Sequence, residues 1–99
     1  MRQITFSELV QLQQSGKNFL LIDVREPEEH ERFNIGGKLI PLREIISRAS
    51  EIPRGHPVVV YCRKGIRSQI AIQRLEEKFG CTNLVNLRGG IGDKPREEG

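Results

Sequence analysis

The sequence has no tryptophan, a single methionine and only two cysteines among its 99 residues. It contains no apolar run near the roughly 20 residues of a membrane span, and its first residues lack the apolar core of a signal peptide. Two cysteines without an export signal favour reduced thiols over a disulfide framework. These absences predict a cytoplasmic protein with no membrane partner, and the length predicts one domain over residues 1–99.

The charge is modestly positive and does not favour nucleic-acid binding. The net charge is +3 and the sequence pI is about 9.2. Nucleic-acid binders show a basic stripe interleaved with aromatic or polar side chains, and this chain has no such stripe. Its one local cluster of cations contains Arg63, Lys64 and Arg67. A small anionic substrate suits such a cluster better than a polyanion does.

Short apolar runs alternate with segments of helical periodicity. The runs are apolar on both faces, which favours parallel strands covered by helices. The alternation predicts an α/β sandwich with a central, mostly parallel sheet of about five short strands and helices on both faces. The expected strands are residues 19–23, 38–42, 58–61 and 83–87, with a short edge strand at residues 3–5.

The helical segments carry start and stop signals. Thr5 and Glu8 form a capping box, and Pro27 suits the first position of a short helix. Gly80 is placed to end the last helix. After it, the polar residues 92–99 predict a frayed tail. The expected helices are residues 5–16, a short helix from Pro27, residues 42–52 and residues 67–80.

Cys62 stands directly after the apolar run 58–61. Ligands in open parallel sheets bind beyond the carboxyl ends of the strands, so this thiol lies where a site is expected. Residues 63–66 must form a tight loop before the next helix, and Gly65 permits the turn. Inward N–H groups of such a loop form a nest for an anion, which favours a nucleophilic thiolate. The alternative is a small buried hydrophobic residue, but the basic loop does not continue an apolar core.

Three motifs, "LIDVREPEEHE", "CRKGIRS" and "NLRGGI", in this order and spacing resemble a single-domain rhodanese, a sulfurtransferase. The resemblance covers nearly the whole chain and implies the rhodanese-like three-layer sandwich. It implies that Cys62 carries a persulfide between a sulfur donor and an acceptor. The matching substrate-binding loop is Arg63, Lys64, Gly65, Ile66 and Arg67, with Ser68 opening the following helix.

The chain departs from the common rhodanese pattern in two places. In "NIGGKLIPL", Asn34 and Gly36 replace the usual His and Pro, a variant similar to rhodanese domains of the adenylyltransferases that sulfurate molybdopterin synthase. That resemblance implies a persulfide-donating or sulfur-accepting protein as partner, beside a small anionic donor such as thiosulfate. Gly92 and Asp93 stand where the family usually has a tryptophan, so we expect the last helix to be short or absent.

Other polar residues are weaker candidates for a functional role. Asp23 and Arg25 lie near the expected site, and an ion-paired supporting role is favoured over acid catalysis because persulfide exchange needs little proton transfer. Cys81 is expected to pack, with a resolving thiol as the alternative. No spacing predicts a metal site, and no cofactor is expected. Little chemical role is expected for His30 and His56. Residues 26–31 are expected to form a solvated helix face. Gly89 and Gly90 are expected to form a turn whose backbone lies close to the active loop.

Two other functions remain open. Cysteine phosphatases and related arsenate reductases need five residues between cysteine and arginine, whereas four separate Cys62 from Arg67. A non-catalytic binding or regulatory module on the same fold is the other alternative. The presence of Cys62 argues against it. The physiological donor and acceptor and the oligomeric state are not predicted.

Overall fold

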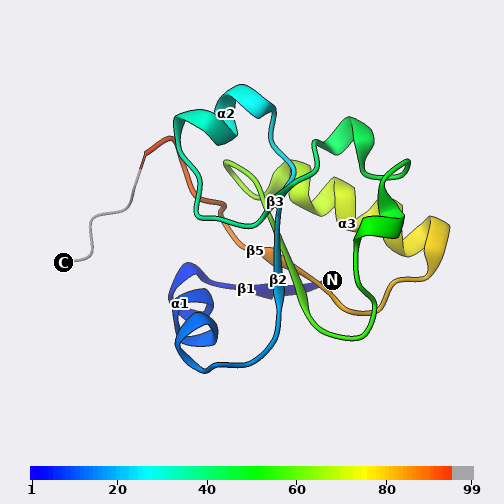
Figure 1. Cartoon of the computed structure of the whole chain (residues 1–99), viewed down its shortest axis with the longest axis horizontal. Helices are drawn as coiled ribbons and strands as arrows, with labels where there is room; N and C mark the ends of the chain where they lie inside the picture. Colours follow the sequence, from blue (N-terminus) through cyan, green and yellow to red (C-terminus); the bar gives the residue numbers. More distant parts are fainter. Residues whose placement is uncertain (95–99) are drawn as a thin grey trace.

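The computed structural model describes residues 1–94 of the chain, and Figure 1 labels its elements. Strands and helices alternate, as the sequence predicts for an α/β domain. In chain order the elements are β1 (Arg2–Ile4), α1 (Phe6–Gln14), β2 (Leu20–Asp23), α2 (Pro27–Arg32), β3 (Lys38–Leu39), the 3₁₀ helices η1 (Leu42–Glu44) and η2 (Ala49–Glu51), β4 (Val58–Tyr61), α3 (Ile66–Phe79) and β5 (Leu84–Leu87).

The sheet has five strands in the order β1-β5-β4-β2-β3, and every pairing is parallel. This confirms the predicted parallel sheet. The central strand β4 is buried at all four positions. Its three consecutive valines suit that place, because β-branched side chains pack well on a pleated surface that is covered on both sides.

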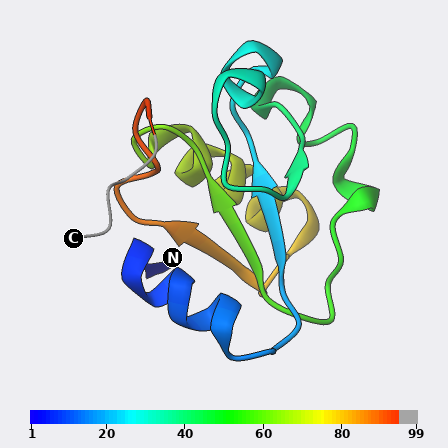
Figure 2. The same ribbon diagram turned by 60° about the vertical axis from the view of Figure 1, so that its left-hand side comes forward.

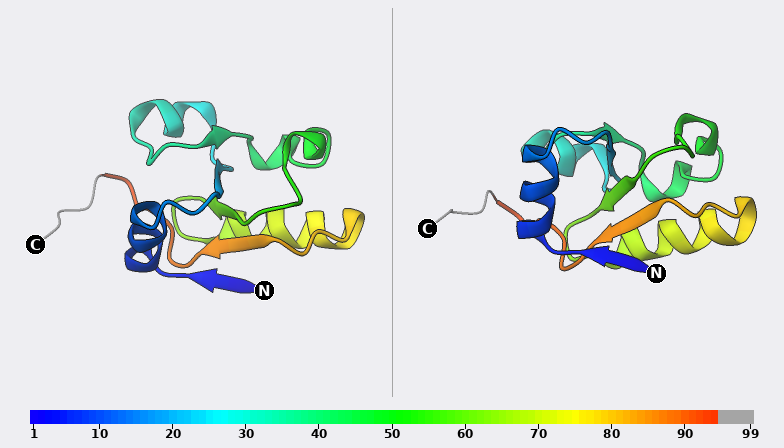
Figure 3. Two further views of the ribbon diagram at one scale, coloured as in Figure 1. Left: turned by 60° about the horizontal axis from the view of Figure 1, so that its bottom comes forward. Right: turned by 90° about the horizontal axis from the view of Figure 1, so that it is seen from below.

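Two apolar clusters cover the two faces of the sheet. Val58 and Val60 of β4 pack with α3, η1 and η2, whereas Val59 and Tyr61 pack with α1 and the segment after α2. The split follows from the two-residue period of a strand, which sends successive side chains to opposite faces. Figures 2 and 3 show α1 and α3 on opposite sides of the sheet, which gives the three layers that the sequence predicts.

The predicted strand over residues 38–42 is too long. β3 pairs with β2 only at Lys38 and Leu39. The N–H of Ile40 still donates to the Asp23 carbonyl at 2.9 Å, but Pro41 has no N–H to continue the ladder. The chain then turns into η1, so the edge strand ends early.

The predicted helix over residues 42–52 is also wrong. Most backbone hydrogen bonds here join residues three apart, as from Ile45 to Leu42 and from Ile52 to Ala49, so the segment forms two 3₁₀ turns. The Ser47 hydroxyl also donates to the Glu44 carbonyl, which competes with regular helical bonding. Ile45 and Ile52 still reach the core, which explains the helical spacing of apolar residues.

No helix follows β5 within residues 88–94. Instead this segment runs beside the loop after β4, as Figure 2 shows in orange to red beside green. The N–H groups of Ile91 and Gly92 donate to the carbonyls of Cys62 and Arg63 at 3.0 and 2.8 Å. The expected frayed tail therefore starts with a bonded residue, and residues 95–99 of that tail lie outside the described part. Within residues 1–94 no helix is long and apolar enough to span a membrane.

Candidate active site

The Cys62 sulfur lies at the carboxyl end of β4, surrounded by hydrogen-bond donors. It accepts the N–H of Gly65 at 3.1 Å and the N–H of Ser68 at 3.4 Å, and the Ser68 hydroxyl oxygen is also 3.4 Å away. Cys62 is buried, with 1% of its surface exposed. The N-terminus of α3 points at the sulfur, and a helix N-terminus stabilises negative charge. The arrangement is therefore suited to hold a thiolate or a persulfide anion.

Gly65 makes the turn that brings these donors together. It caps α3 with a φ of +89°, a conformation that side chains disfavour. A Cβ at this position would also lie 3.1 Å from the Gly89 nitrogen. The helix begins at Ile66, slightly earlier than the start near Arg67 or Ser68 that the sequence predicts. Ser68 therefore lies in the first turn of α3, and its N–H is directed at the sulfur.

A buried polar network lies beneath the sulfur. The Ser68 hydroxyl donates to Oδ1 of Asn86, a fully buried residue of β5. The Asn86 amide donates in turn to Gln3 of β1 at 3.1 Å and to the Gly65 carbonyl at 3.5 Å. Asn86 and Gln3 are not predicted as site residues. The signal for Asn86 is a polar residue inside the apolar run "NLVNL", because a buried amide needs partners.

The segment after β5 holds the loop from outside. Its N–H groups bind the Cys62 and Arg63 carbonyls, so those carbonyls point away from the sulfur while the loop N–H groups point toward it. Gly90 allows this approach, because a Cβ there would lie 2.3 Å from the Arg63 oxygen. The predicted close approach is thus confirmed at Gly90. At Gly89 the backbone also lies near Gly65, but this approach does not require a glycine, because a Cβ on Gly89 would meet no atom within 4 Å; the φ of +79° favours glycine there instead.

Two of the three loop cations are paired with carboxylates. The Arg67 guanidinium donates to both oxygens of Glu29, at 2.6 and 2.9 Å, and Arg63 pairs with Asp93. Hydrogen bonds from Arg67 lower the pKa of Glu29 to about 2, and Glu29 raises the pKa of Arg67. Among the described residues Lys64 has no ion-pair partner. The prediction of a solvated face is therefore wrong at Glu29, which is partly buried in this pair.

Asp23, at the end of β2, and Arg25, two residues later, form a buried ion pair. The Arg25 Nη2 donates to Asp23 at 2.8 Å and to the Phe33 carbonyl at 2.6 Å. Burial opposes the charge of Arg25, but the hydrogen bonds to Asp23 and the negative charges of Asp23, Tyr61 and Glu29 together outweigh burial and raise the pKa of Arg25. His30, for which little role is expected, also lies 2.8 Å from the Asp23 carboxylate. These contacts fix α2 and the chain that follows it at the carboxyl edge of the sheet.

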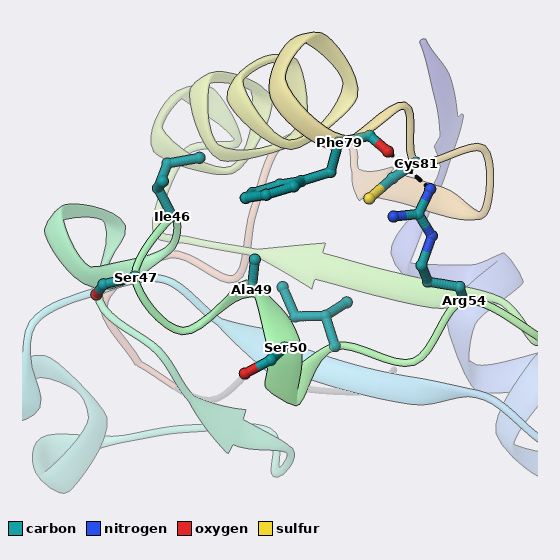
Figure 4. A pocket seen from close by; sticks show the side chains of 8 residues that line it. Ile46, Ser47, Ala49, Ser50, Arg54, Phe79 and Cys81 are labelled. Atoms are coloured by element: carbon teal, nitrogen blue, oxygen red, sulfur yellow. Dashed lines mark hydrogen bonds between the residues drawn. The ribbon is translucent and has the colours of Figure 1, made fainter.

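Cys81 lies away from Cys62. It follows the C-terminus of α3, whose 14 residues span about 21 Å, while Cys62 precedes the N-terminus. Cys81 is buried and lines a separate cavity of about 400 Å³ between η2 and the end of α3 (Figure 4). Arg54 lies at the edge of this cavity, and its side chain donates to the Phe79 carbonyl at 2.7 Å. The position fits the packing role that the sequence favours and separates Cys81 from the reaction centre.

Among residues 1–94 no three His, Cys, Asp or Glu side chains are grouped so that they could hold a metal ion.

The fold is a parallel α/β sandwich, and a cysteine directly follows its central strand. The sulfur of this cysteine accepts N–H groups of a tight loop. These features define the class as an α/β domain with a cysteine-containing anion-binding loop. The sequence profile of the rhodanese-like domain matches residues 5–93. The chain therefore belongs to the rhodanese-like family, and the resemblance seen in its three motifs is confirmed.

Individual relatives agree with this assignment. The chain is 48% identical over 72 residues to the uncharacterized protein YqhL of Bacillus subtilis, across 72% of this chain and 56% of the relative. It is 39% identical over 90 residues to a sulfurtransferase of Allochromatium vinosum, across 90% and 83% of the two chains. A crystal structure of a rhodanese-like domain protein from Staphylococcus aureus superposes with a TM-score of 0.83 at 27% identity, covering 98% and 100% of the two chains.

The expected similarity to adenylyltransferase-linked domains is also confirmed. The chain is 38% identical over 91 residues to the probable adenylyltransferase/sulfurtransferase MoeZ of Mycobacterium tuberculosis. The match covers 89% of this chain but only 23% of MoeZ, so most of that relative has no counterpart in the matched region.

Proposed function

We propose that the protein is a sulfurtransferase that carries a sulfane sulfur as a persulfide on Cys62. The observation that carries the proposal is the sulfur's position, buried at the start of α3 and accepting the N–H groups of Gly65 and Ser68. Membership of the rhodanese-like family and a relative named sulfurtransferase support sulfur transfer in general.

The reaction consists of two displacements at sulfur. The Cys62 thiolate attacks the outer sulfur of the donor, the bond between that sulfur and the rest of the donor breaks, and the donor group leaves with the electron pair. Cys62 then carries the transferred sulfur as a persulfide. A thiophilic acceptor attacks this terminal sulfur, and Cys62 leaves as a thiolate. No cofactor is required, because no net oxidation or reduction occurs in the two steps together.

The loop residues have distinct roles in this proposal. The N–H groups of Gly65 and Ser68 stabilise the anionic sulfur in the way that preorganised dipoles stabilise charge in a closed site. Lys64, Arg63 and Arg67 attract and position the donor, and Ile66 lines the entrance with an exposed side chain. Asp23, the last residue of β2, and Arg25, two residues later, hold α2 and the segment after it in place and do not touch the reacting atoms in this mechanism.

The donors that fit are thiosulfate, a polysulfide or a protein persulfide, and the acceptor is a small thiophile or a thiol-bearing protein. Similarity to MoeZ, which is named for both adenylyltransferase and sulfurtransferase functions, supports a protein partner. We also propose a cytoplasmic location, because a persulfide carrier needs a thiol that stays reduced.

The proposal is tested by loading the protein with sulfur. Wild-type protein incubated with thiosulfate or polysulfide should gain the mass of one sulfur atom, mapped to Cys62, and should convert cyanide to thiocyanate. Cys62→Ser should lose both the added mass and the transfer, with an unchanged circular dichroism spectrum. Cys81→Ser is the matched control and should keep most of the activity.

Three outcomes would contradict the proposal. Transfer that survives in Cys62→Ser would remove the persulfide mechanism. Strong hydrolysis of an aryl phosphate without sulfur transfer would favour the phosphatase alternative. A wild-type protein that takes up no sulfur from any of the donors would favour a non-catalytic binding module.

A further inference from the structure

We propose that Glu29 and Asp93 determine which sulfur donors the site accepts. By pairing with two of the three loop cations, they select against small dianions such as thiosulfate and favour donors that carry one negative charge or none. The inference rests on the proposed sulfur transfer at Cys62 and adds the substrate class. It narrows the expectation from the sequence, in which Arg63, Lys64 and Arg67 form a local cluster suited to a small anion.

The Arg67–Glu29 pair is the stronger of the two. Both terminal nitrogens of the guanidinium face the carboxylate, a two-point geometry that strengthens an ion pair. Both side chains are partly buried, at 33% and 25% exposure, so solvent screens the pair incompletely. The charge of Cys62 also acts on Arg67 and helps to raise its pKa, which places this guanidinium within the field of the sulfur. A dianionic donor must therefore compete with Glu29 for Arg67.

The Arg63–Asp93 pair acts at the other side of the loop. It is more exposed, at 45% and 61%, so its effect is expected to be smaller. Asp93 is nevertheless held close, because the preceding Gly92 is bonded to the Arg63 carbonyl at 2.8 Å. Lys64 remains as the loop cation without a described carboxylate partner, and a single ammonium suits a donor of low charge.

The chemistry explains why this pairing discriminates. When the Cys62 thiolate attacks thiosulfate, the sulfur–sulfur bond breaks, sulfite leaves as a dianion with the electron pair, and the persulfide anion keeps the third charge. Three negative charges then lie within the site, and cations already bound to carboxylates stabilise them less. A thiosulfonate anion reacts in the same way but releases a singly charged sulfinate. A persulfide presented by a protein likewise brings little charge.

The entrance of the site agrees with a donor of this class. Ile66 follows Gly65 at the start of α3 and is 62% exposed. An exposed apolar side chain on the loop that holds the sulfur contributes nothing to binding a hydrated dianion. It can contact an alkyl group or the apolar surface of a protein that delivers the sulfur.

The test compares two donors that differ by one charge, thiosulfate and methanethiosulfonate, in which a methyl group replaces one charged oxygen. The rate of Cys62 persulfide formation is measured by intact mass in single-turnover experiments on wild type, Glu29→Gln and Asp93→Asn. Glu29→Gln should raise the thiosulfate rate relative to the methanethiosulfonate rate by about 3–10-fold, and Asp93→Asn by about 2-fold. Glu28→Gln is the matched control, because Glu28 lies on the same helix, is exposed and has no described partner.

The outcomes distinguish an effect on donor selectivity from a displacement of the loop. Added salt should reduce the thiosulfate advantage of Glu29→Gln, because salt screens the freed Arg67. An unchanged donor ratio in both variants would overturn the proposal, and so would an equal loss of rate with both donors, which indicates only a displaced loop. Should Glu29→Gln unfold, Asp93→Asn decides alone. The absence of persulfide with either donor in wild type would instead contradict the proposed function itself.

Discussion

Gly90 is the residue at which the chain after β5 comes closest to the reactive loop. A side chain there would overlap the Arg63 carbonyl at 2.3 Å and the Cys62 carbonyl at 2.5 Å, and the residue has a φ of +67°. We expect Gly90→Ala to push the loop carbonyls away and to turn the Gly65 and Ser68 N–H groups off the sulfur. Persulfide formation should therefore slow sharply, and urea unfolding should show a loss of about 2–5 kcal/mol from overlap and backbone strain together.

Gly89 provides the matched control for this prediction. It has a similar φ of +79°, but a Cβ there would meet no atom within 4 Å. Gly89→Ala should therefore cost only the backbone strain of about 1–2 kcal/mol and leave the rate of sulfur uptake nearly unchanged. Equal effects of the two substitutions on both stability and rate would show that the close approach at Gly90 does not position the loop.

The residues of the site also differ in how far they can be predicted from the sequence. Cys62 and its loop are contiguous, so their chemistry is visible in one short motif. Glu29, His30, Asn86 and Asp93 come from distant segments. Glu29, Asn86 and Asp93 meet the loop, and His30 meets Asp23, only because parallel strands bring α2 and the end of β5 to the same edge of the sheet. Without the fold, no spacing in the sequence pairs Glu29 with an arginine 38 positions later.

At the scale of elements, the pair between Glu29 and Arg67 joins α2 to α3. Because the pKa of Glu29 is lowered from its ordinary value of 4.5 to about 2, the folded state binds its proton less readily than the unfolded state does. The pair with Arg67, together with the Glu26 N–H that the same carboxylate accepts at 3.0 Å, therefore contributes its full stability above pH 4.5, and this contribution is lost as the pH falls toward about 2. Allowing for partial exposure, we expect about 1–2 kcal/mol at pH 7.

Urea unfolding of wild type and Glu29→Gln at several pH values tests this expectation. Wild type should be the more stable protein at pH 7, and the difference should shrink between pH 4.5 and pH 3. Glu28→Gln, with an exposed carboxylate on the same helix, should follow wild type throughout. A difference that stays constant down to pH 3 would mean that ionisation of Glu29 does not stabilise the fold.

The elements themselves divide into those that local sequence determines and those that it does not. Buried strands such as β4 are rich in β-branched and aromatic residues, and α1 and α3 carry caps and a clear apolar face, so the sequence predicts them well. The chain between β3 and β4 is different. Over two turns, a 3₁₀ helix and an α-helix place apolar residues at nearly the same spacing, so periodicity alone cannot separate η1 and η2 from one helix.

The whole molecule places its two thiols at opposite ends of α3. A disulfide requires the two Cα atoms to lie within about 7 Å, whereas the helix between these cysteines spans about 21 Å. A persulfide on Cys62 therefore cannot be resolved by Cys81 of the same chain while the fold is intact. In the proposed mechanism sulfur must therefore leave through an external acceptor, which is the behaviour expected of a carrier.

We therefore expect that mild oxidation of the native protein, or of its Cys62 persulfide, yields no disulfide between Cys62 and Cys81. Intact mass and peptide mapping of the monomer, made after alkylation under non-reducing conditions, should show the two cysteines in separate peptides. The same treatment in concentrated urea is the control, because unfolding removes the helical spacer and should allow the link to form. A linked monomer obtained without denaturant would show that the end of α3 opens readily, and it would return Cys81 to the reaction as a resolving thiol.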